Sequence, residues 1–335
     1  MQRWSEAMAK ALYGPSGFYR VHQPAEHFRT SVTATPVFSR AIARLLHAVD
    51  EALERPRSID LVDVGAGSGE LVAQVVDELD PAIRRRLNVT AVEIRPAPPE
   101  VPNDVRWTDA LPRQIKGLIV ANEYLDNVPC DVVAHEAGQL RYVLVDESGD
   151  ESLGHEIASD HGEWFRTWWP MTSDVSRAEI GDQRDQAWTS LINALDRGVA
   201  LAIDYGHVYS ERASSAYAAG TLTGYRDGHQ VVPIPDGSCD ITAHVAIDAC
   251  QEAGLQAGAE HTALMTQRDA LDHLGTQGTV PDRSLATSDP VEYVRQLSEA
   301  SSAAELRDPM SLGSFWWLLQ SKGVPLPIGT GALSG

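Results

Sequence analysis

The feature that most constrains the fold is a glycine turn between an apolar strand and an amphipathic helix. Residues 59–64 form a short, mostly apolar run, which is typical of a buried central strand. Gly65, Gly67 and Gly69 follow at alternate positions, and residues 71–79 then place apolar side chains on one helix face. Because glycine lets the backbone pass close to a ligand above a strand end, this order predicts an α/β fold that binds a nucleotide.

The spacing of the glycines indicates which nucleotide is bound. The dinucleotide fingerprint is G-x-G-x-x-G, and its third glycine would stand where this chain has Glu70. A carboxylate there repels a pyrophosphate but can accept hydrogen bonds from an ammonium group. The motif therefore favours S-adenosylmethionine (SAM), which has an amino-acid end and no phosphate, and disfavours a nicotinamide-dependent dehydrogenase. An ordinary strand-to-helix turn without a cofactor is the alternative.

Further cofactor contacts are expected at the ends of the next two strands. Glu93 ends the second predicted strand and lies 24 positions beyond the last glycine of the turn. This is close to the interval of about 20 at which a carboxylate holds a ribose diol. Asp109 and Ala110 follow a weak third strand, where an acidic residue can meet the adenine amine. Thr30 is a further candidate for the ligand cleft, although a turn or capping role suits it equally well.

A dense polar loop follows the fourth predicted strand, residues 117–121. Asn122, Glu123, Asp126 and Asn127 place four polar side chains within six positions. Open α/β sheets bind their ligands outside the carboxyl ends of the strands. We therefore predict that Glu123, Asp126 and Asn122 serve catalysis, and that Asn122 also contacts the cofactor. The alternative for Glu123 is a role in the loop or at SAM without contact to the acceptor.

The rest of the chain predicts a core that an insertion interrupts. We expect an N-terminal cap at 1–58, the first half of the SAM-binding core at 59–130, an inserted hairpin and Trp-rich substrate region at 131–185, the second half of the core with a substrate-side excursion at 186–324, and a disordered tail at 325–335.

The sequence also predicts the secondary structure. Strands are predicted at 59–64, 87–94, 105–108, 117–121, 132–135, 140–145, 199–203 and 263–266. Helices are predicted at 7–12, from 36, at 70–79, from 81, at 185–195 and ending at 253, and a loop is predicted at 146–160. The aromatic residues at 164–169 are expected to cover the insertion, and substrate stacking is the alternative.

Composition narrows the choice of partner and compartment. The 335 residues carry a formal net charge of −20, which argues against nucleic acid and favours a basic partner. No apolar run reaches the length of about 18 residues expected of a membrane helix, and no signal peptide is evident. The three cysteines have no metal-ligand or disulfide spacing, so we expect no metal and a reducing, cytoplasmic location. The excess of arginine over lysine suggests a bacterial source.

Several short motifs occur in one order between about residues 11 and 250. They are Ala-Leu-Tyr-Gly-Pro-Ser-Gly-Phe-Tyr at 11–19, Phe-Arg-Thr-Ser at 28–31, the glycine turn at 63–69, Ala-Asn-Glu-Tyr-Leu-Asp-Asn-Val-Pro at 121–129, Ala-Ile-Asp-Tyr-Gly at 202–206, Gly-Thr-Leu at 220–222 with Tyr-Arg at 225–226, and Asp-Ile-Thr-Ala-His-Val at 240–245. With them the chain resembles class I SAM-dependent methyltransferases. Within these it is similar to the MidA family, which includes the mitochondrial complex I assembly arginine methyltransferase.

The resemblance implies an α/β fold with a Rossmann-like, seven-stranded sheet, an N-terminal helical cap and an inserted hairpin and substrate region. It also implies SAM at the end of the first strand and an arginine of a protein as methyl acceptor.

The acceptor is less well defined than the cofactor. Glu26 and His27 stand where the family usually has Gly-Asp, and the C-terminal third is divergent and rich in tryptophan. Beyond the two loop carboxylates, the candidates for contact with the substrate are Glu179, Tyr205, His229 and His244. Three functions stay open: a protein arginine N-methyltransferase, a small-molecule O- or N-methyltransferase that uses a histidine base, and a SAM-binding assembly factor. The sequence does not predict the oligomeric state.

Overall fold

The chain divides into two compact units. The computed structural model describes residues 1–22, 36–136, 138–170, 176–214, 216–276 and 278–328. The unit that contains residues 29–122, 194–203 and 259–335 is called the sheet unit here. The unit that contains residues 1–28, 123–193 and 204–258 is called the hairpin unit. This division separates the start of the predicted N-terminal cap, which lies in the hairpin unit, from the helix that begins at Pro36.

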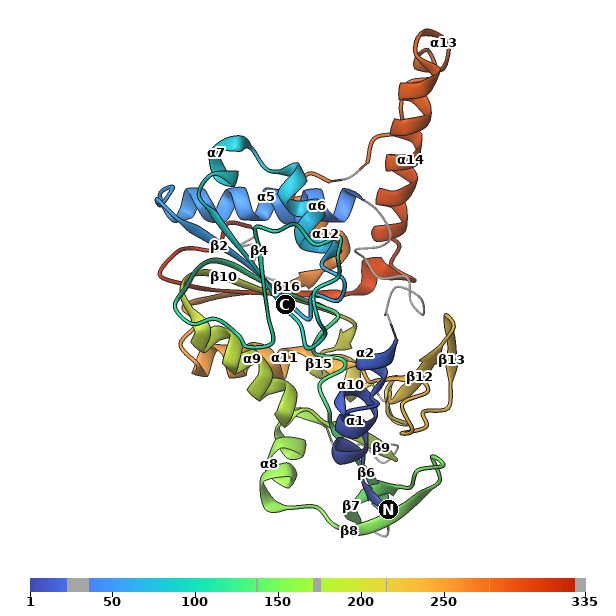
Figure 1. Ribbon diagram of the computed structural model, residues 1–335. Coiled ribbons are helices and arrows are strands. Elements are labelled where there is room, and N and C mark those ends of the chain that lie inside the picture. Colours follow the sequence, from blue (N-terminus) through green and yellow to red (C-terminus); the bar gives the residue numbers. More distant parts are fainter. Residues whose placement is uncertain (23–35, 137, 171–175, 215, 277, 329–335) are drawn as a thin grey trace. The chain divides into compact units, whose positions relative to one another are not determined.

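The sheet unit is built on one seven-stranded sheet (Figure 1). Its strands lie in the order β16-β17-β10-β5-β2-β3-β4. They are β2 (Ile59–Val64), β3 (Leu87–Val92), β4 (Val105–Thr108), β5 (Ile115–Asn122), β10 (Leu195–Asp204), β16 (His261–Thr266) and β17 (Trp316–Lys322). The five strands from β4 to β10 pair in parallel, and β16 pairs antiparallel with β17. Strand order reverses between β2 and β5, where a doubly wound sheet of this kind binds its ligand. The predicted seven-stranded α/β sheet is confirmed.

Two glycines allow the neighbouring strands β2, β5 and β10 to approach closely at paired positions. Asp60 on β2, Gly117 on β5 and Gly198 on β10 lie in register. A Cβ atom on Gly117 would lie 2.0 Å from the carbonyl oxygen of Asp60, and a Cβ atom on Gly198 would lie 2.0 Å from that of Gly117. Both glycines also have a positive φ, +153° and +130°. The centre of the sheet therefore requires glycine at these two positions.

Helices and the sheet share one apolar core in this unit. The helices are α5 (Pro36–Ala52), α6 (Glu70–Glu78), α7 (Pro81–Arg84), α12 (Gln267–His273), α13 (Leu285–Ser288) and α14 (Pro290–Leu306), with the short 3-10 helix η1 (Leu312–Ser314). Figure 1 shows α5 and α6 side by side on one face of the sheet. Phe38 on α5 meets Trp317 on β17 edge to face, with ring centroids 6.2 Å apart. Burial of these apolar faces is what holds the helices on the sheet.

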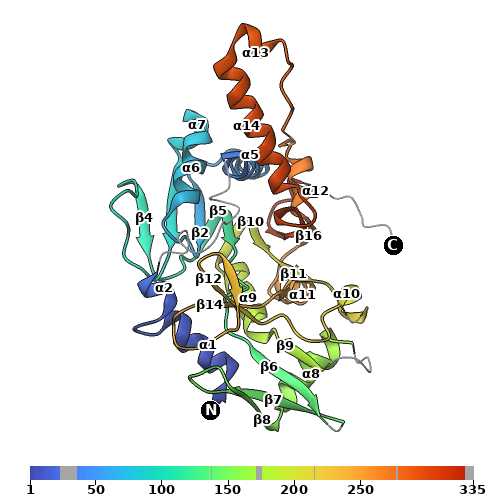
Figure 2. The same cartoon turned by 90° about the vertical axis from the view of Figure 1, so that its right-hand side faces the viewer.

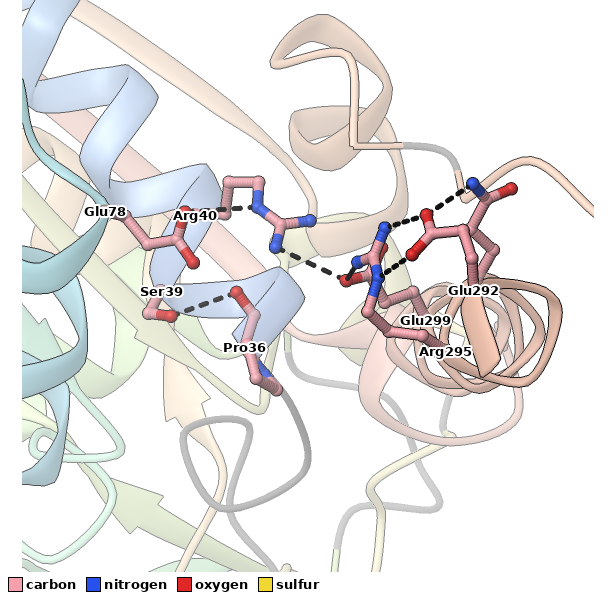
Figure 3. Close-up of polar contacts among 8 residues, drawn as sticks. Pro36, Ser39, Arg40, Glu78, Glu292, Arg295 and Glu299 are labelled. Carbon is pink, nitrogen blue, oxygen red and sulfur yellow. Dashed lines mark hydrogen bonds and ion pairs between the residues drawn. The ribbon is translucent and has the colours of Figure 1, made fainter. Parts of the chain in front are cut away.

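A chain of ion pairs connects α6, α5 and α14 (Figure 3). Arg40 on α5 lies 3.3 Å from Glu78 and 3.6 Å from Glu299 on α14. Glu299 in turn pairs with Arg295, 2.5 Å away, and Arg295 pairs with Glu292. Beyond this chain α14 extends away from the sheet, with α13 at its outer end (Figure 1, Figure 2).

The hairpin unit contains a five-stranded sheet, two small sheets and six helices among its described residues. The five-stranded sheet has the order β1-β7-β6-β9 with β8 on β7, and consists of β1 (Gln2–Arg3), β6 (Asp131–Glu136), β7 (Gln139–Val145), β8 (Glu151–Glu156) and β9 (Arg177–Ile180). The small sheets pair β11 (Gly206–His207) with β15 (Val245–Ala246), and join β13 (His229–Val231), β12 (Thr223–Arg226) and β14 (Asp240–Thr242). The helices are α1 (Trp4–Tyr13), α2 (Phe18–Val21), α8 (Ser159–Trp168), α9 (Asp182–Ala194), α10 (Tyr209–Ala213) and α11 (Ile247–Gln256).

The predicted hairpin at 132–145 is confirmed as β6 and β7. The aromatic residues at 164–169 cover the insertion, as expected, since Phe165 and Trp169 are buried against its sheet. Trp164 donates a hydrogen bond of 2.6 Å to the Asp185 carboxylate.

Four expectations about local structure were wrong. Residues 146–160 are not all loop, because β8 pairs with β7 and α8 begins at Ser159. The helix expected at 185–195 starts three residues earlier, at Asp182. The last helix of the excursion runs three residues beyond 253, to Gln256. The tail expected from residue 325 packs against the core at Ile328, which is 7% exposed, while residues 329–335 lie outside the described part.

Candidate active site

The glycine turn has the backbone geometry that its sequence predicts. Gly65, Gly67 and Gly69 have φ angles of +75°, +60° and +80°, which L side chains rarely adopt. A Cβ atom on Gly69 would also press on Trp107 and Val101, at 3.1 and 3.2 Å. Gly69 precedes the first residue of α6, Glu70, and lies in the left-handed region. The turn thus presents bare backbone at the carboxyl end of β2.

Glu93 is hydrogen-bonded to this turn. One of its carboxylate oxygens accepts a hydrogen bond of 2.9 Å from the Gly67 N–H, and the other accepts one of 3.1 Å from the Arg95 N–H. The turn and the carboxylate expected at the ribose are therefore linked in the folded chain. Burial, and then the charge of Glu93, raises the pKa of the neighbouring Asp63 carboxyl to about 7.

The other residues predicted at the cofactor lie at the ends of two strands. Asp109 and Ala110 are exposed just after β4, and the Ala110 N–H donates to the Thr108 hydroxyl at 3.1 Å. Asn122 is the last residue of β5. Thr30, with the whole 28–31 motif, lies outside the described residues.

In the hairpin unit, Asp126 is the centre of a hydrogen-bonded cluster. Its side chain is 3% exposed. One carboxylate oxygen, Oδ2, accepts hydrogen bonds from the Tyr205 hydroxyl and, at 2.7 Å, from the Thr242 hydroxyl. The two hydroxyl groups also contact each other. Burial raises the pKa of Asp126, and the two hydroxyl groups oppose this because they stabilise the carboxylate.

Two further carboxyl groups belong to the same cluster. Asp204, the last residue of β10, accepts hydrogen bonds from the backbone N–H groups of Leu125 and Asp126, at 2.9 and 3.2 Å. Burial, and then the charge of Asp126, raises its pKa well above the usual value. Asp240 accepts hydrogen bonds from the Tyr19 hydroxyl and the Asn127 amide, and burial raises its pKa to about 7.

The buried cation beside the cluster does not neutralise it by direct pairing. Arg184 on α9 is 1% exposed. Its guanidinium donates to three backbone carbonyl groups, those of Asp126, Val128 and His244, at 2.8, 3.2 and 2.8 Å. Among the described residues, no carboxylate lies within ion-pair distance of it. Arg184 therefore fixes the backbone of the cluster, and its charge favours the ionised forms of Asp126 and Asp204 without direct pairing, which opposes the rise of their pKa values.

Glu123 adopts a strained backbone conformation at the start of the polar loop. Its φ is +49°, in the left-handed region that costs a residue with a side chain about 1–3 kcal/mol. Such a conformation persists only where the surrounding structure holds it in place, and it often occurs at functional sites. Glu123 also adds its charge to the field that acts on Asp204.

The remaining substrate candidates are dispersed. Glu179 is 3% exposed, and its carboxylate accepts hydrogen bonds from Thr221 and Leu222, which gives it a structural role. His229 is exposed on β13, away from the cluster's hydrogen bonds. The His244 ring lies edge to face with Tyr205, with centroids 5.2 Å apart. Contact of these residues with a substrate stays a prediction.

Asp204, Thr242 and Arg184 were not among the site residues predicted from the sequence. They come from segments separated from Asp126 by 58 to 116 positions, so no local motif joins them. One signal was present: Asp204 ends a strand of the parallel sheet, where polar residues gather around ligands.

Comparison with known proteins identifies the family of the chain. Residues 41–265 match the model of a family described as "Putative S-adenosyl-L-methionine-dependent methyltransferase". The chain belongs to this family of SAM-dependent methyltransferases. The predicted resemblance, enzyme class and cofactor are thereby confirmed. No curated protein matches the chain at a significant level.

Two crystal structures of Burkholderia thailandensis proteins are similar over nearly the whole chain. One, bound to S-adenosyl-homocysteine, is 26% identical with a TM-score of 0.79, and covers 96% of this chain and 88% of its own. The other, a native structure, is 27% identical with a TM-score of 0.77 and the same coverage.

The residues of the glycine turn fit this methyltransferase cofactor. The turn leaves room for a ligand because a Cβ atom on Gly67 would meet only Arg95, 3.9 Å away. When bound, SAM supplies the transferable methyl group and leaves as S-adenosylhomocysteine.

None of the described helices is long and apolar enough to span a membrane. No group of three or more His, Cys, Asp or Glu side chains in the described ranges is arranged to hold a metal ion.

Proposed function

We propose that this methyltransferase acts on a guanidinium nitrogen of an arginine side chain in a basic protein. The observation that supports it is the cluster of three buried carboxyl groups around Asp126. Asp126, Asp204 and Asp240 are buried in one cluster with Glu123 close by, and the buried Arg184 is bonded to backbone carbonyl groups. Buried carboxylates are costly unless a cation neutralises them. A cationic acceptor would supply that charge.

The chemistry of arginine methylation suits a site of this kind. A guanidinium is a poor nucleophile because it is protonated and its lone pairs are delocalised. Carboxylates that grip it orient one nitrogen and localise the positive charge on the others. The N–C bond then forms as the C–S bond of SAM breaks, S-adenosylhomocysteine leaves, and the proton lost by the nitrogen passes to one of these carboxylates. We assign the carboxylate roles to Asp126 and Glu123, and a positioning role to Asn122.

The cofactor roles follow the geometry of the sheet unit. We assign the backbone of Gly65, Gly67 and Gly69 to the space beside SAM and Glu93 to its ribose. The Glu93 carboxylate already lies within hydrogen-bond distance of the Gly67 N–H. Glu70, Asp109, Ala110 and Thr30 complete the proposed set, with Glu70 at the N-terminus of α6.

One observation favours a second candidate, a small-molecule O- or N-methyltransferase. The ring nitrogen Nδ1 of His244 is buried, and it has no hydrogen-bond partner in the described part of the chain. Burial lowers the pKa of this histidine, so its ring is neutral at pH 7. A neutral imidazole can take a proton from a hydroxyl or amine acceptor.

Labelled-methyl transfer separates the two candidates. SAM with a labelled methyl group is incubated with the enzyme and a lysate of the source organism, and labelled products are mapped by mass spectrometry. The proposal predicts label on arginine side chains of proteins. Label found only on a small metabolite, or on protein residues other than arginine, would contradict it.

Two substitutions test the loop. We expect Asp126→Asn and Glu123→Gln to keep most of the SAM affinity and to lower turnover. The loss of a hydrogen bond to a charged group, about 1.5–3 kcal/mol, corresponds to roughly 10- to 150-fold. Asp160→Asn, an exposed site on α8, is the matched control. Parent rates in both loop variants would make the loop structural.

A further inference from the structure

Asp204 has a feature in common with Asp126 that the loop sequence does not show. Both carboxyl groups are almost fully buried, at 0% and 3% exposure. In each, the Oδ2 atom is fully occupied by hydrogen-bond donors of the chain. In each, the Oδ1 atom is buried and has no hydrogen-bond partner in the described structure. A buried polar atom without a partner destabilises the folded state, so two in one cluster require an explanation.

The Asp204 carboxylate lies against the main chain of Asp126. Asp204 Oδ2 accepts its hydrogen bond from the backbone N–H of Asp126 itself, at 3.2 Å. The backbone carbonyl of the same residue is held by Arg184, at 2.8 Å. The pair is therefore fixed in position by the main chain, and its two unpartnered oxygen atoms come from neighbouring side chains.

We propose that Asp126 and Asp204 together bind the guanidinium of the acceptor, and that binding displaces a proton which the two carboxyl groups share. This inference rests on the proposed function, and it adds Asp204 as a residue that determines acceptor specificity. A guanidinium carries several N–H donors in a fixed plane, so it can serve two carboxyl oxygens at once. A lysine ammonium is a more compact point charge and lacks this fork.

The shared proton follows from the environment of the pair. When two buried carboxyl groups lie close together, the charge of each disfavours ionisation of the other, as the charge of Asp126 does for Asp204. Asp126 receives two hydroxyl donors, which favour its anion, and Asp204 is the group on which burial and the neighbouring charge keep the proton. The other titratable groups that act on the pair include Arg184, Glu123, Asp240, Cys250, Tyr19, Tyr205 and Tyr225. A guanidinium placed on both carboxyl groups would replace the proton as the positive charge.

Calorimetry in two buffers measures the proton directly. The blocked peptide acetyl-Gly-Gly-Arg-Gly-Gly-amide is titrated at pH 7 into the enzyme with S-adenosylhomocysteine present, once in phosphate and once in Tris. The heat of binding differs between buffers in proportion to the protons released. We expect the parent enzyme to release roughly one proton per peptide, and the lysine peptide to bind at least about tenfold more weakly. The citrulline peptide, which is neutral, should release none.

Two variants locate the proton. Asp204→Asn keeps an oxygen that can accept from Leu125 and Asp126, so the fold is retained, which circular dichroism checks. It should release almost no proton and bind the arginine peptide at least about tenfold more weakly. Asp185→Asn is the control for a carboxyl with a raised pKa outside this cluster, and it should release the proton as the parent does.

Several results would overturn the inference. Equal binding heats in both buffers for the parent, unchanged proton release in Asp204→Asn, or no arginine-peptide binding up to about 10 mM would each do so. The failure is distinguishable from failure of the proposed function. If labelled methyl still appears on protein arginine while Asp204→Asn behaves as the parent, only the role of Asp204 is lost. If the label appears on another acceptor, the proposed function itself is lost.

Discussion

At the scale of single residues, Glu93 is the side chain on which the cofactor assignment can be tested most directly. Its carboxylate lies against the Gly67 N–H, so it is already placed beside the glycine turn. Glu93→Ala should weaken SAM binding by about 1.5–3 kcal/mol for each lost hydrogen bond, because the ribose loses a charged acceptor. Titration calorimetry with SAM measures this. Glu100→Ala, an exposed carboxylate of the same unit, controls for charge. Equal SAM affinity in parent and Glu93→Ala would remove the ribose assignment.

Asp63 gives a second residue-scale prediction, on stability and pH. Its pKa rises from 3.8 in the unfolded chain to about 7 in the folded protein. Between about pH 4 and 7 the folded state therefore holds a proton that the unfolded state has lost. Stability contributed by this group is present at low pH and declines as pH rises through that window, by up to about 4 kcal/mol.

Asp63→Asn removes this titration, so its unfolding free energy should fall less between pH 4 and 7 than that of the parent. Urea denaturation at a series of pH values measures the difference. In the parent, the pKa of the Asp185 carboxyl rises only to about 6. Asp185→Asn should therefore change the pH dependence of the unfolding free energy less than Asp63→Asn does, and the change should be complete at a lower pH. Identical pH dependence in parent and Asp63→Asn would show that Asp63 ionises normally.

At the scale of the elements, the contact of β2, β5 and β10 depends on glycine. An alanine at Gly117 would place its Cβ atom 2.0 Å from the Asp60 carbonyl oxygen, so one strand must shift. We expect Gly117→Ala to lower the free energy of unfolding by at least about 1–3 kcal/mol, the usual cost of overpacking. Thermal denaturation measures it. Gly138→Asn is the control, because its φ of +86° suits asparagine and nothing lies within 4 Å. A parent-like midpoint for Gly117→Ala would show that the sheet adapts freely.

The elements also show how far the sequence predicts this fold. Strands β2, β5 and β10 were predictable because long buried runs of apolar residues mark them. The exposed strand β8 has polar, non-alternating residues, and its pairing with β7 rather than its own pattern makes it a strand. The helix α14 was missed because its buried residues are Ala300, Ala303 and Leu306, two of them too small to give a clear apolar period.

The candidate site divides in the same way. The glycine turn is one continuous segment of sequence, and so is the loop at 122–126. Each could therefore be predicted as part of the candidate site from a local motif. The contacts of Asp126 with Tyr205 and Thr242 join segments 79 and 116 positions apart, and only the folded chain brings them together.

At the scale of the whole molecule, charge is the property that bears on the partner. The net charge of −20 makes long-range attraction of a basic protein favourable and of an anionic partner unfavourable. The sequence predicts this as well as the structure does, because net charge does not depend on the fold. It acts before contact, on the rate of encounter rather than on the chemical step.

Salt should therefore separate the acceptor from the cofactor. The Debye length falls from about 10 Å at 0.1 M salt to about 3 Å at 1 M, which screens attraction between the acidic enzyme and a basic protein. With a protein acceptor, kcat/KM should fall as the salt concentration rises, because the rate of encounter falls. SAM binding, measured by calorimetry over the same range, should change little because SAM makes short-range contacts. A short arginine peptide is the internal control: it presents the same guanidinium with much less charge, so its turnover should fall less. If turnover on the protein and on the peptide respond to salt equally, or SAM affinity falls in parallel, the acidic surface does not attract the acceptor.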